Sequence, residues 1–125
     1  RSIYVGDRGN RRVQVFDENG KFLDEWDNIQ GPSDIKVMTD GTLWVTSGVG
    51  NRLAKYDLET GKLLTWWGMY GAFPGAMDNP HFSSVDSEGN LYVAISSNVK
   101  SGIEKYVPRA GADRTRLMGQ PLVVR

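Results

Sequence analysis

The chain has 125 residues, the size of one ordinary domain, and its 15 lysine and arginine residues balance 15 aspartate and glutamate residues. This neutral charge argues against a nucleic-acid partner, and the absence of cysteine excludes disulfides, zinc–thiolate sites and thiol nucleophiles. The longest apolar run is far shorter than the roughly 20 residues that span a bilayer, so we expect no membrane partner either.

The first predicted unit, residues 1–31, reads as three short strands. Residues 3–5, 13–16 and 22–26 alternate apolar and polar side chains, which is typical of strands with one buried face. A polar loop separates the first two strands, and a turn at Gly20 separates the last two. No segment of the chain keeps a helical period, so the pattern indicates an all-β protein.

The second and third units repeat one pattern. Residues 32–45 align with residues 80–93 over 14 positions without a gap, and each stretch reads as a strand, a glycine turn and a second strand. A third strand ending in tyrosine follows in both units. The fourth strand is clear at residues 61–67 of the second unit, whereas Leu117 and Met118 are its only apolar pair in the third.

A four-stranded antiparallel unit of this length is the blade of a β-propeller. We therefore predict a propeller segment of three four-stranded blades, with units at 1–31, 32–79 and 80–120 and a closing innermost strand at 121–125. Propellers usually close with about four to eight blades. The segment is then half of a six-bladed ring, and the other half comes either from a second copy, giving a homodimer, or from missing sequence. The absence of an initial methionine is compatible with the second alternative.

Residues 4–16, followed by Gly20-Lys21-Phe22 and Trp26, resemble an NHL repeat, and so do residues 80–93. NHL repeats build six-bladed propellers, which agrees with two halves of three blades. Within this superfamily, residues 78–93 are similar to bacterial relatives of the peptidyl-α-hydroxyglycine α-amidating lyases. The resemblance implies a bacterial exported protein, whereas the residues alone leave the compartment unknown.

The lyase resemblance also implies a zinc ion held by histidines near the channel. One of these histidines follows the proline that opens the innermost strand of a blade, and His81 matches that position. The corresponding residue of the preceding blade is Ser33, which cannot replace a histidine ligand. Catalytic zinc normally has three protein ligands, and this chain has one histidine. Zinc therefore stays open as a cofactor, and the alternative role of His81 is a hydrogen bond to a neighbouring loop.

The starts of the innermost strands and a long connector define a candidate ligand site at the channel mouth. The connector, residues 68–79, leads directly into the strand that carries the histidine. Long irregular loops in compact folds tend to be functional, so we expect it either to wall the channel or to pack as a lid on a neighbouring blade or partner. The candidate ligand-binding residues are His81, Ser33, Asp34, Tyr70 and Phe73.

A small cationic cluster, Arg8, Arg11 and Arg12, lies in the loop of the first unit. It either holds a carboxylate or phosphate group or pairs with nearby acidic side chains. Taken together, the residues favour a propeller scaffold that binds a small molecule, a peptide or a partner at the channel mouth. The alternatives are a metal-dependent lyase or hydrolase resembling peptidylamidoglycolate lyase, with His81 as a metal ligand, and a protein–protein interaction module. The sequence identifies no catalytic residue.

Overall fold

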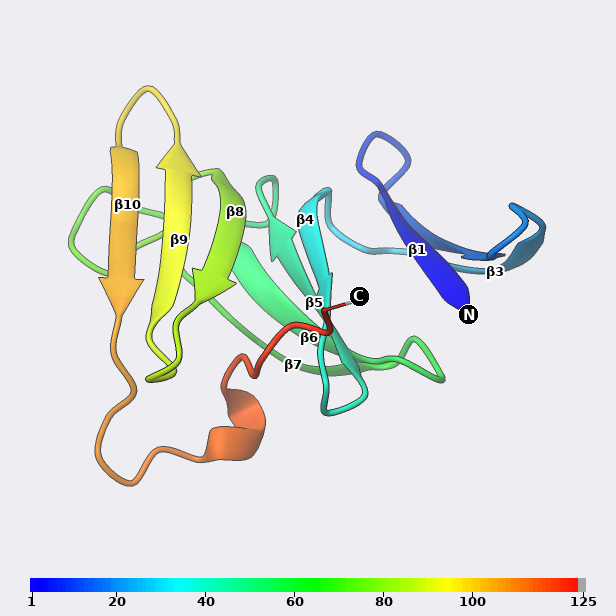
Figure 1. Ribbon diagram of the computed structural model, residues 1–125. Helices are drawn as coiled ribbons and strands as arrows, with labels where there is room; N and C mark the ends of the chain where they lie inside the picture. Colours follow the sequence, from blue (N-terminus) through cyan, green and yellow to red (C-terminus); the bar gives the residue numbers. More distant parts are fainter. Residues whose placement is uncertain (124–125) are drawn as a thin grey trace.

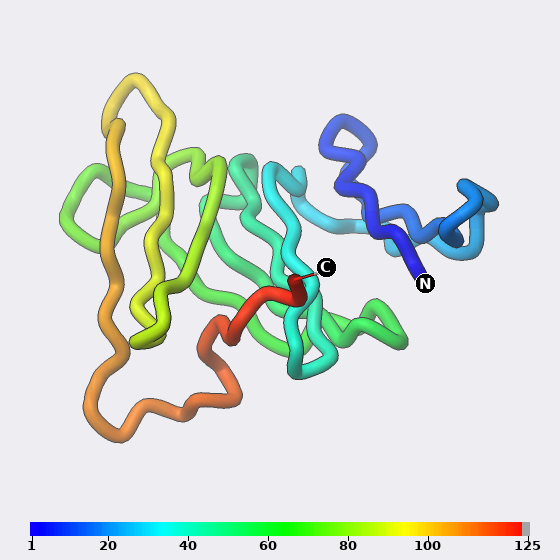
Figure 2. Tube along the Cα trace, in the orientation of Figure 1, coloured from blue at the N-terminus to red at the C-terminus, as the bar shows by residue number. Residues whose placement is uncertain are grey.

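A computed structural model describes residues 1–123, and this part of the chain forms ten β-strands and one short 3-10 helix. Figures 1 and 2 show the strands grouped into three sheets that lie side by side. No helix in the described range is long and apolar enough to cross a membrane. The elements are β1 (Ser2–Asp7), β2 (Arg12–Asp17), β3 (Phe22–Trp26), β4 (Pro32–Val37), β5 (Thr42–Ser47), β6 (Arg52–Asp57), β7 (Leu63–Trp67), β8 (Pro80–Val85), β9 (Leu91–Ser96), β10 (Ser101–Tyr106) and η1 (Arg114–Arg116).

Each sheet is an antiparallel meander in which consecutive strands pair. The first sheet has the order β1-β2-β3, the second β4-β5-β6-β7 and the third β10-β9-β8. Figure 1 shows the second sheet between the other two, with the N-terminal strands on one side and β8 to β10 on the other. This arrangement confirms the predicted all-β propeller segment with three successive blades. As predicted, the first blade begins with its second strand and the middle blade is complete.

The C-terminal segment differs from the predicted strands. The sequence predicts a fourth strand for the third blade and a closing strand at 121–125, but residues 107–123 form η1 and no strand. This segment contains two prolines, two glycines and no run of alternating apolar residues, so it lacks the pattern of a strand with one buried face. It returns to β4, where the Leu122 amide donates to the Val37 carbonyl at 2.7 Å. Residues 124–125 of the predicted closing strand lie outside the described residues.

Two apolar cores hold the blades together. The core between the first and second blades contains the fully buried side chains of Val13 and Leu43. The core between the second and third blades combines Trp44 and Leu53 with Val93. Within residues 1–123, the outward faces of the first and third blades have no neighbouring sheet.

The turn between β8 and β9 is built around the carboxylate of Asp86. This carboxylate accepts hydrogen bonds from Asn90 Nδ2 at 2.9 Å, from the backbone amides of Glu88 and Asn90, and from the Tyr92 hydroxyl. These bonds, with that of the Asn90 side chain the strongest, outweigh partial desolvation and lower the pKa of Asp86 to about 2.

We expect this carboxylate to contribute stability that is present above about pH 4, the ordinary range of an unfolded aspartate, and lost as the pH falls toward 2. Stability falls as the pH falls because the unfolded chain, whose Asp86 has the higher pKa, binds the proton before the folded chain does. NMR titration of the Asp86 carboxyl carbon measures the folded pKa, and Asp86→Asn should flatten the acid limb of the unfolding curve. A folded-state midpoint near 4 would contradict the hydrogen-bonded turn.

Candidate functional site

Ser33 and His81 occupy equivalent places at the start of two innermost strands. In β4 the pairing register shifts between Pro32 and Asp34, so Ser33 is the extra, bulged residue. In β8 the register shifts between Pro80 and Phe82, so His81 is the bulged residue there. Bulges redirect side chains at sheet edges and are common beside functional sites. The His81 side chain is exposed, and that of Ser33 is half-buried.

Ser33 anchors the loop between β5 and β6. Its hydroxyl accepts a hydrogen bond from the Gly48 amide at 3.2 Å. A Cβ atom at Gly48 would lie 2.8 Å from Ser33 Oγ and 2.6 Å from Asn79 Oδ1, so the loop approaches this closely only because residue 48 is glycine. Asn79 continues the network, since its amide donates to Asn51 Oδ1 at 2.8 Å and its side chain donates to the Ser96 carbonyl.

Asp34 joins the innermost strands of the second and third blades. Its carboxylate accepts a hydrogen bond from the Ser83 amide at 3.0 Å and forms an ion pair with Lys36 at 2.8 Å. The Ser83 hydroxyl in turn contacts Thr46 Oγ1 at 2.8 Å, and the Lys36 ammonium lies 4.0 Å from the centre of the Phe82 ring. Asp34 therefore holds two blades together at the edge that carries Ser33 and His81.

The connector between β7 and β8 is fixed to the third blade. Its residues Ala76 and Met77 are fully buried. The Lys100 ammonium donates to the carbonyls of Phe73 and Ala76, both at 3.0 Å. The side chains of Tyr70 and Phe73 are more than half exposed. The connector is thus packed as a lid on a neighbouring blade, and it turns its two predicted aromatic residues outward.

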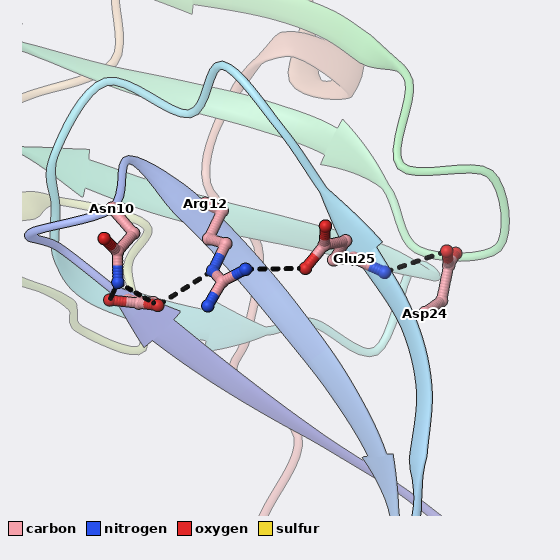
Figure 3. A network of polar contacts seen from close by, with 5 residues as sticks. Asn10, Arg12, Asp24 and Glu25 are labelled. Atoms are coloured by element: carbon pink, nitrogen blue, oxygen red, sulfur yellow. Dashed lines mark hydrogen bonds and ion pairs between the residues drawn. The ribbon is translucent and has the colours of Figure 1, made fainter.

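One arginine of the predicted cationic cluster, Arg12, is already paired. Figure 3 shows Arg12 between two carboxylates: its Nε lies 2.8 Å from Asp7 Oδ2 and its Nη1 lies 2.8 Å from Glu25 Oε2. Hydrogen bonds from Asn10 and Arg12 lower the pKa of Asp7. Arg12 therefore takes the second of the two expected roles, in a local ion-pair network at the end of the blade. Arg8 and Arg11 take part in none of the ion pairs found among residues 1–123.

An apolar hollow of 410 Å³ between the second and third blades was not indicated by the sequence. In the other blade interface, the turn after β6 places Gly61 against the Trp26 ring, where an added Cβ would lie only 2.7 Å from it. Gly111 is the equivalent residue of the third blade, because it follows Tyr106 by five residues as Gly61 follows Tyr56. Nothing lies within 4 Å of the Cβ position of Gly111, so this turn leaves the space open. The side chains that wall the hollow include Trp67, Val85, Leu91, Tyr106, Leu117 and Met118.

This hollow can hold an apolar group but offers little reactive chemistry. Burial raises the pKa of Tyr106 to about 12, so its hydroxyl stays protonated. One feature of the sequence could have indicated the hollow: the strand pattern is interrupted after Tyr106, and residues 107–123 form no strand that covers Trp67.

Lys55 is a buried cation that the sequence pattern also missed. Its side chain is 6% exposed, and its ammonium lies 2.9 Å from Asp40 Oδ2 and 2.7 Å from the Thr115 carbonyl. Partial desolvation acts to raise the pKa of Asp40, but hydrogen bonds from Thr42 and Lys55 outweigh it and lower the pKa. The cation therefore fastens the C-terminal segment to the middle blade.

The described residues do not assemble a metal site within one chain. A catalytic zinc ion is normally held by three protein ligands. Within residues 1–123, no three histidine, aspartate or glutamate side chains lie close enough together to hold a metal ion. His81 and Asp34 lie on separate blades, and the carboxylate of Asp34 is taken up by Lys36 and Ser83. A single copy thus does not fit the zinc centre that the lyase resemblance implies.

Comparison with known proteins identifies the repeat type. No model of a known protein family matches the chain. NHL repeat-containing protein 3 of Mus musculus is 46% identical over 43 aligned residues, which cover 31% of this chain and 12% of that protein. The Homo sapiens protein of the same name is 44% identical over 43 residues, with the same coverage. The chain thus matches only a small part of the length of these curated relatives.

Solved structures identify the fold. A protein of unknown function from Bacteroides caccae superposes with a TM-score of 0.66 at 15% identity, over 78% of this chain and 35% of that one. Virginiamycin B lyase from Staphylococcus aureus, in a catalytically inactive histidine-to-alanine form with quinupristin, gives a TM-score of 0.57 at 20% identity, over 84% of this chain and 37% of that one. The chain therefore spans little more than a third of these neighbours.

The fold is that of a β-propeller, seen here as a sector of three blades. A stretch of 43 aligned residues is similar to NHL repeat-containing protein 3, which confirms the resemblance to NHL repeats drawn from the sequence. The likeness to these two structures concerns the fold only, because they share 15% and 20% of aligned residues with this chain.

Proposed function

We propose that the protein is a propeller scaffold that binds a small ligand or peptide at the channel mouth, in a six-bladed ring completed by a second copy. The equivalent bulges at Ser33 and His81 support this most directly. They repeat one site in two neighbouring blades, at the start of the strands expected to line the channel. The exposed imidazole of His81 provides a hydrogen-bonding group there. We include Tyr70 and Phe73 among the ligand contacts because both are more than half exposed and lie on the connector that leads into β8.

A metal-dependent lyase is the second candidate function. Two observations favour it: His81 is exposed on an innermost strand, and a propeller of similar fold is a lyase that is described as inactive when a histidine is replaced by alanine. A second copy would bring a second His81 into the ring, so any metal site would be shared between copies. A plain protein-interaction module is the remaining alternative.

A fragment screen read by melting temperature tests the binding function. A ligand present at 100 times its Kd stabilises the native state by about 2.7 kcal/mol, which raises Tm measurably. We expect fragments that raise Tm of the unaltered protein but not of His81→Ala, while Glu59→Ala, an exposed change in the turn after β6, keeps the response.

The outcome separates the candidate functions. Equal Tm shifts in the unaltered protein and His81→Ala would refute a site at the channel mouth. Stoichiometric zinc by elemental analysis, lost in His81→Ala, together with turnover of a peptidyl-α-hydroxyglycine, would replace simple binding by the lyase function. No metal and no turnover would remove the lyase.

A further inference from the structure

Corresponding positions in the three blades show what each blade face is built to contact. Three residues, Val13, Leu53 and Ile103, occupy the equivalent position in the three blades. The strand pairing shows this equivalence, because their partners on the neighbouring strands are Gly6, Thr46 and Ala94. We call the face that carries this position, turned toward the next blade in the chain, the following face. Val13 and Leu53 are 0% exposed because the next blade covers them, whereas Ile103 is 74% exposed.

The following face of the third blade also shares a lysine–aromatic pair with that of the second. In the second blade, the Lys55 ammonium lies 5.8 Å from the centre of the Trp44 ring. In the third blade, the Lys105 ammonium lies 5.5 Å from the centre of the Tyr92 ring, at the corresponding pair of positions. Beside Ile103 this face has a hollow of 500 Å³. The following face of the third blade therefore has the features of a blade interface, but no blade packs against it within residues 1–123.

The opposite end of the molecule has the complementary face. The preceding face of each blade is turned toward the blade before it in the chain. On this face the second blade carries Leu43 and Val45, which are at most 1% exposed, and the third carries Leu91 and Val93, which are at most 7% exposed. The first blade has Ile3 and Val5 at the corresponding positions, and these are 47% and 41% exposed. Phe16 and Phe22 extend this apolar face, with ring centroids 5.9 Å apart.

We propose that the following face of the third blade binds the preceding face of the first blade of a second copy. This inference rests on the proposed two-copy ring and names its contact surfaces. Both halves of the joint occur on one chain, but the middle blade separates them, so a single copy cannot join them (Figure 1). The new joint would repeat the two blade interfaces already present. Three blades of six sweep half a turn, so two head-to-tail joints close on themselves.

Light scattering of the 125-residue chain tests the joint. We expect the unaltered chain to have twice the 13.9 kDa mass of one copy. Ile103→Asp and Ile3→Asp should each weaken association by about 100-fold or more, because each buries a carboxylate without a partner. Val99→Asp is the matched control, since Val99 is 65% exposed but lies in the loop between β9 and β10, and it should leave the dimer intact.

Mixing the two variants distinguishes head-to-tail pairing from pairing of like faces. Each variant alone has one damaged surface in every joint, whereas the mixed pair has one joint in which both surfaces are unaltered. We therefore expect the mixture to recover dimers at high concentration. If Ile103→Asp does not fold by circular dichroism, Ile103→Thr keeps the β-branched shape and replaces it.

Each result decides between the two levels of the proposal. A folded, unaltered chain with the mass of one copy, or of more than two, would overturn the two-copy ring itself. A dimer that survives both aspartate variants would overturn only the assigned faces. Loss of the dimer in one variant alone would indicate that like faces pair, and no recovery on mixing would also refute the head-to-tail joint.

Discussion

Gly61→Ala should lower the free energy of unfolding by about 3 kcal/mol or more. Gly61 has a φ of +67°, a conformation that costs a residue with a Cβ about 1–2 kcal/mol. The added methyl group would also lie 2.7 Å from the ring atoms of Trp26, which is only 7% exposed. Either the turn after β6 or the indole must move, and both movements open the core between the first two blades.

Gly20→Ala is the matched control for this substitution. Gly20 lies in the corresponding turn of the first blade with a φ of +84°, but nothing lies within 4 Å of its Cβ position. We expect it to lose only the backbone term, about 1–2 kcal/mol. Urea unfolding of both variants measures the difference. Equal losses would show that Gly61 does not form a tight contact with Trp26.

The blades could be predicted from the sequence because their strands and turns are determined by neighbouring residues. Alternating side chains and glycine turns select strands and hairpins without reference to distant residues. The ungapped alignment of residues 32–45 with 80–93 even placed Ser33 and His81 at equivalent positions, and the structure shows the same bulge at both. Repetition also let the three predicted units emerge as three sheets in chain order.

The rest depends on contacts between residues that are far apart in the chain. Lys55 looks like the polar side of an alternating strand, but it is buried because Thr115, 60 residues away, covers it. Similarly, nothing local indicates that Lys100 clamps the connector, which decides where Tyr70 and Phe73 lie. The predicted fourth strand of the third blade is absent for the same reason. Its apolar pair, Leu117 and Met118, suggested a strand, but burial of Met118 in the second core holds both residues in an irregular segment.

Leu53→Ala should lower the free energy of unfolding by about 3 kcal/mol, within the range measured for buried leucines. Leu53 is 0% exposed in the core between the second and third blades, and truncation leaves a cavity against Val93 and Met77. Ile103→Ala removes a similar side chain from the corresponding position of the third blade, where 74% of it is exposed. At concentrations low enough to keep single copies, we expect that variant to lose less than about 0.5 kcal/mol.

The contrast between the two variants should shrink as the protein concentration rises. A second copy that covers the third blade would bury Ile103 as the third blade buries Leu53, so Ile103→Ala would then cost stability through the lost joint. Urea unfolding at several concentrations measures this directly. A loss from Ile103→Ala that is the same at every concentration would mean that Ile103 never enters an interface, and that its likeness to Val13 and Leu53 is one of sequence position alone.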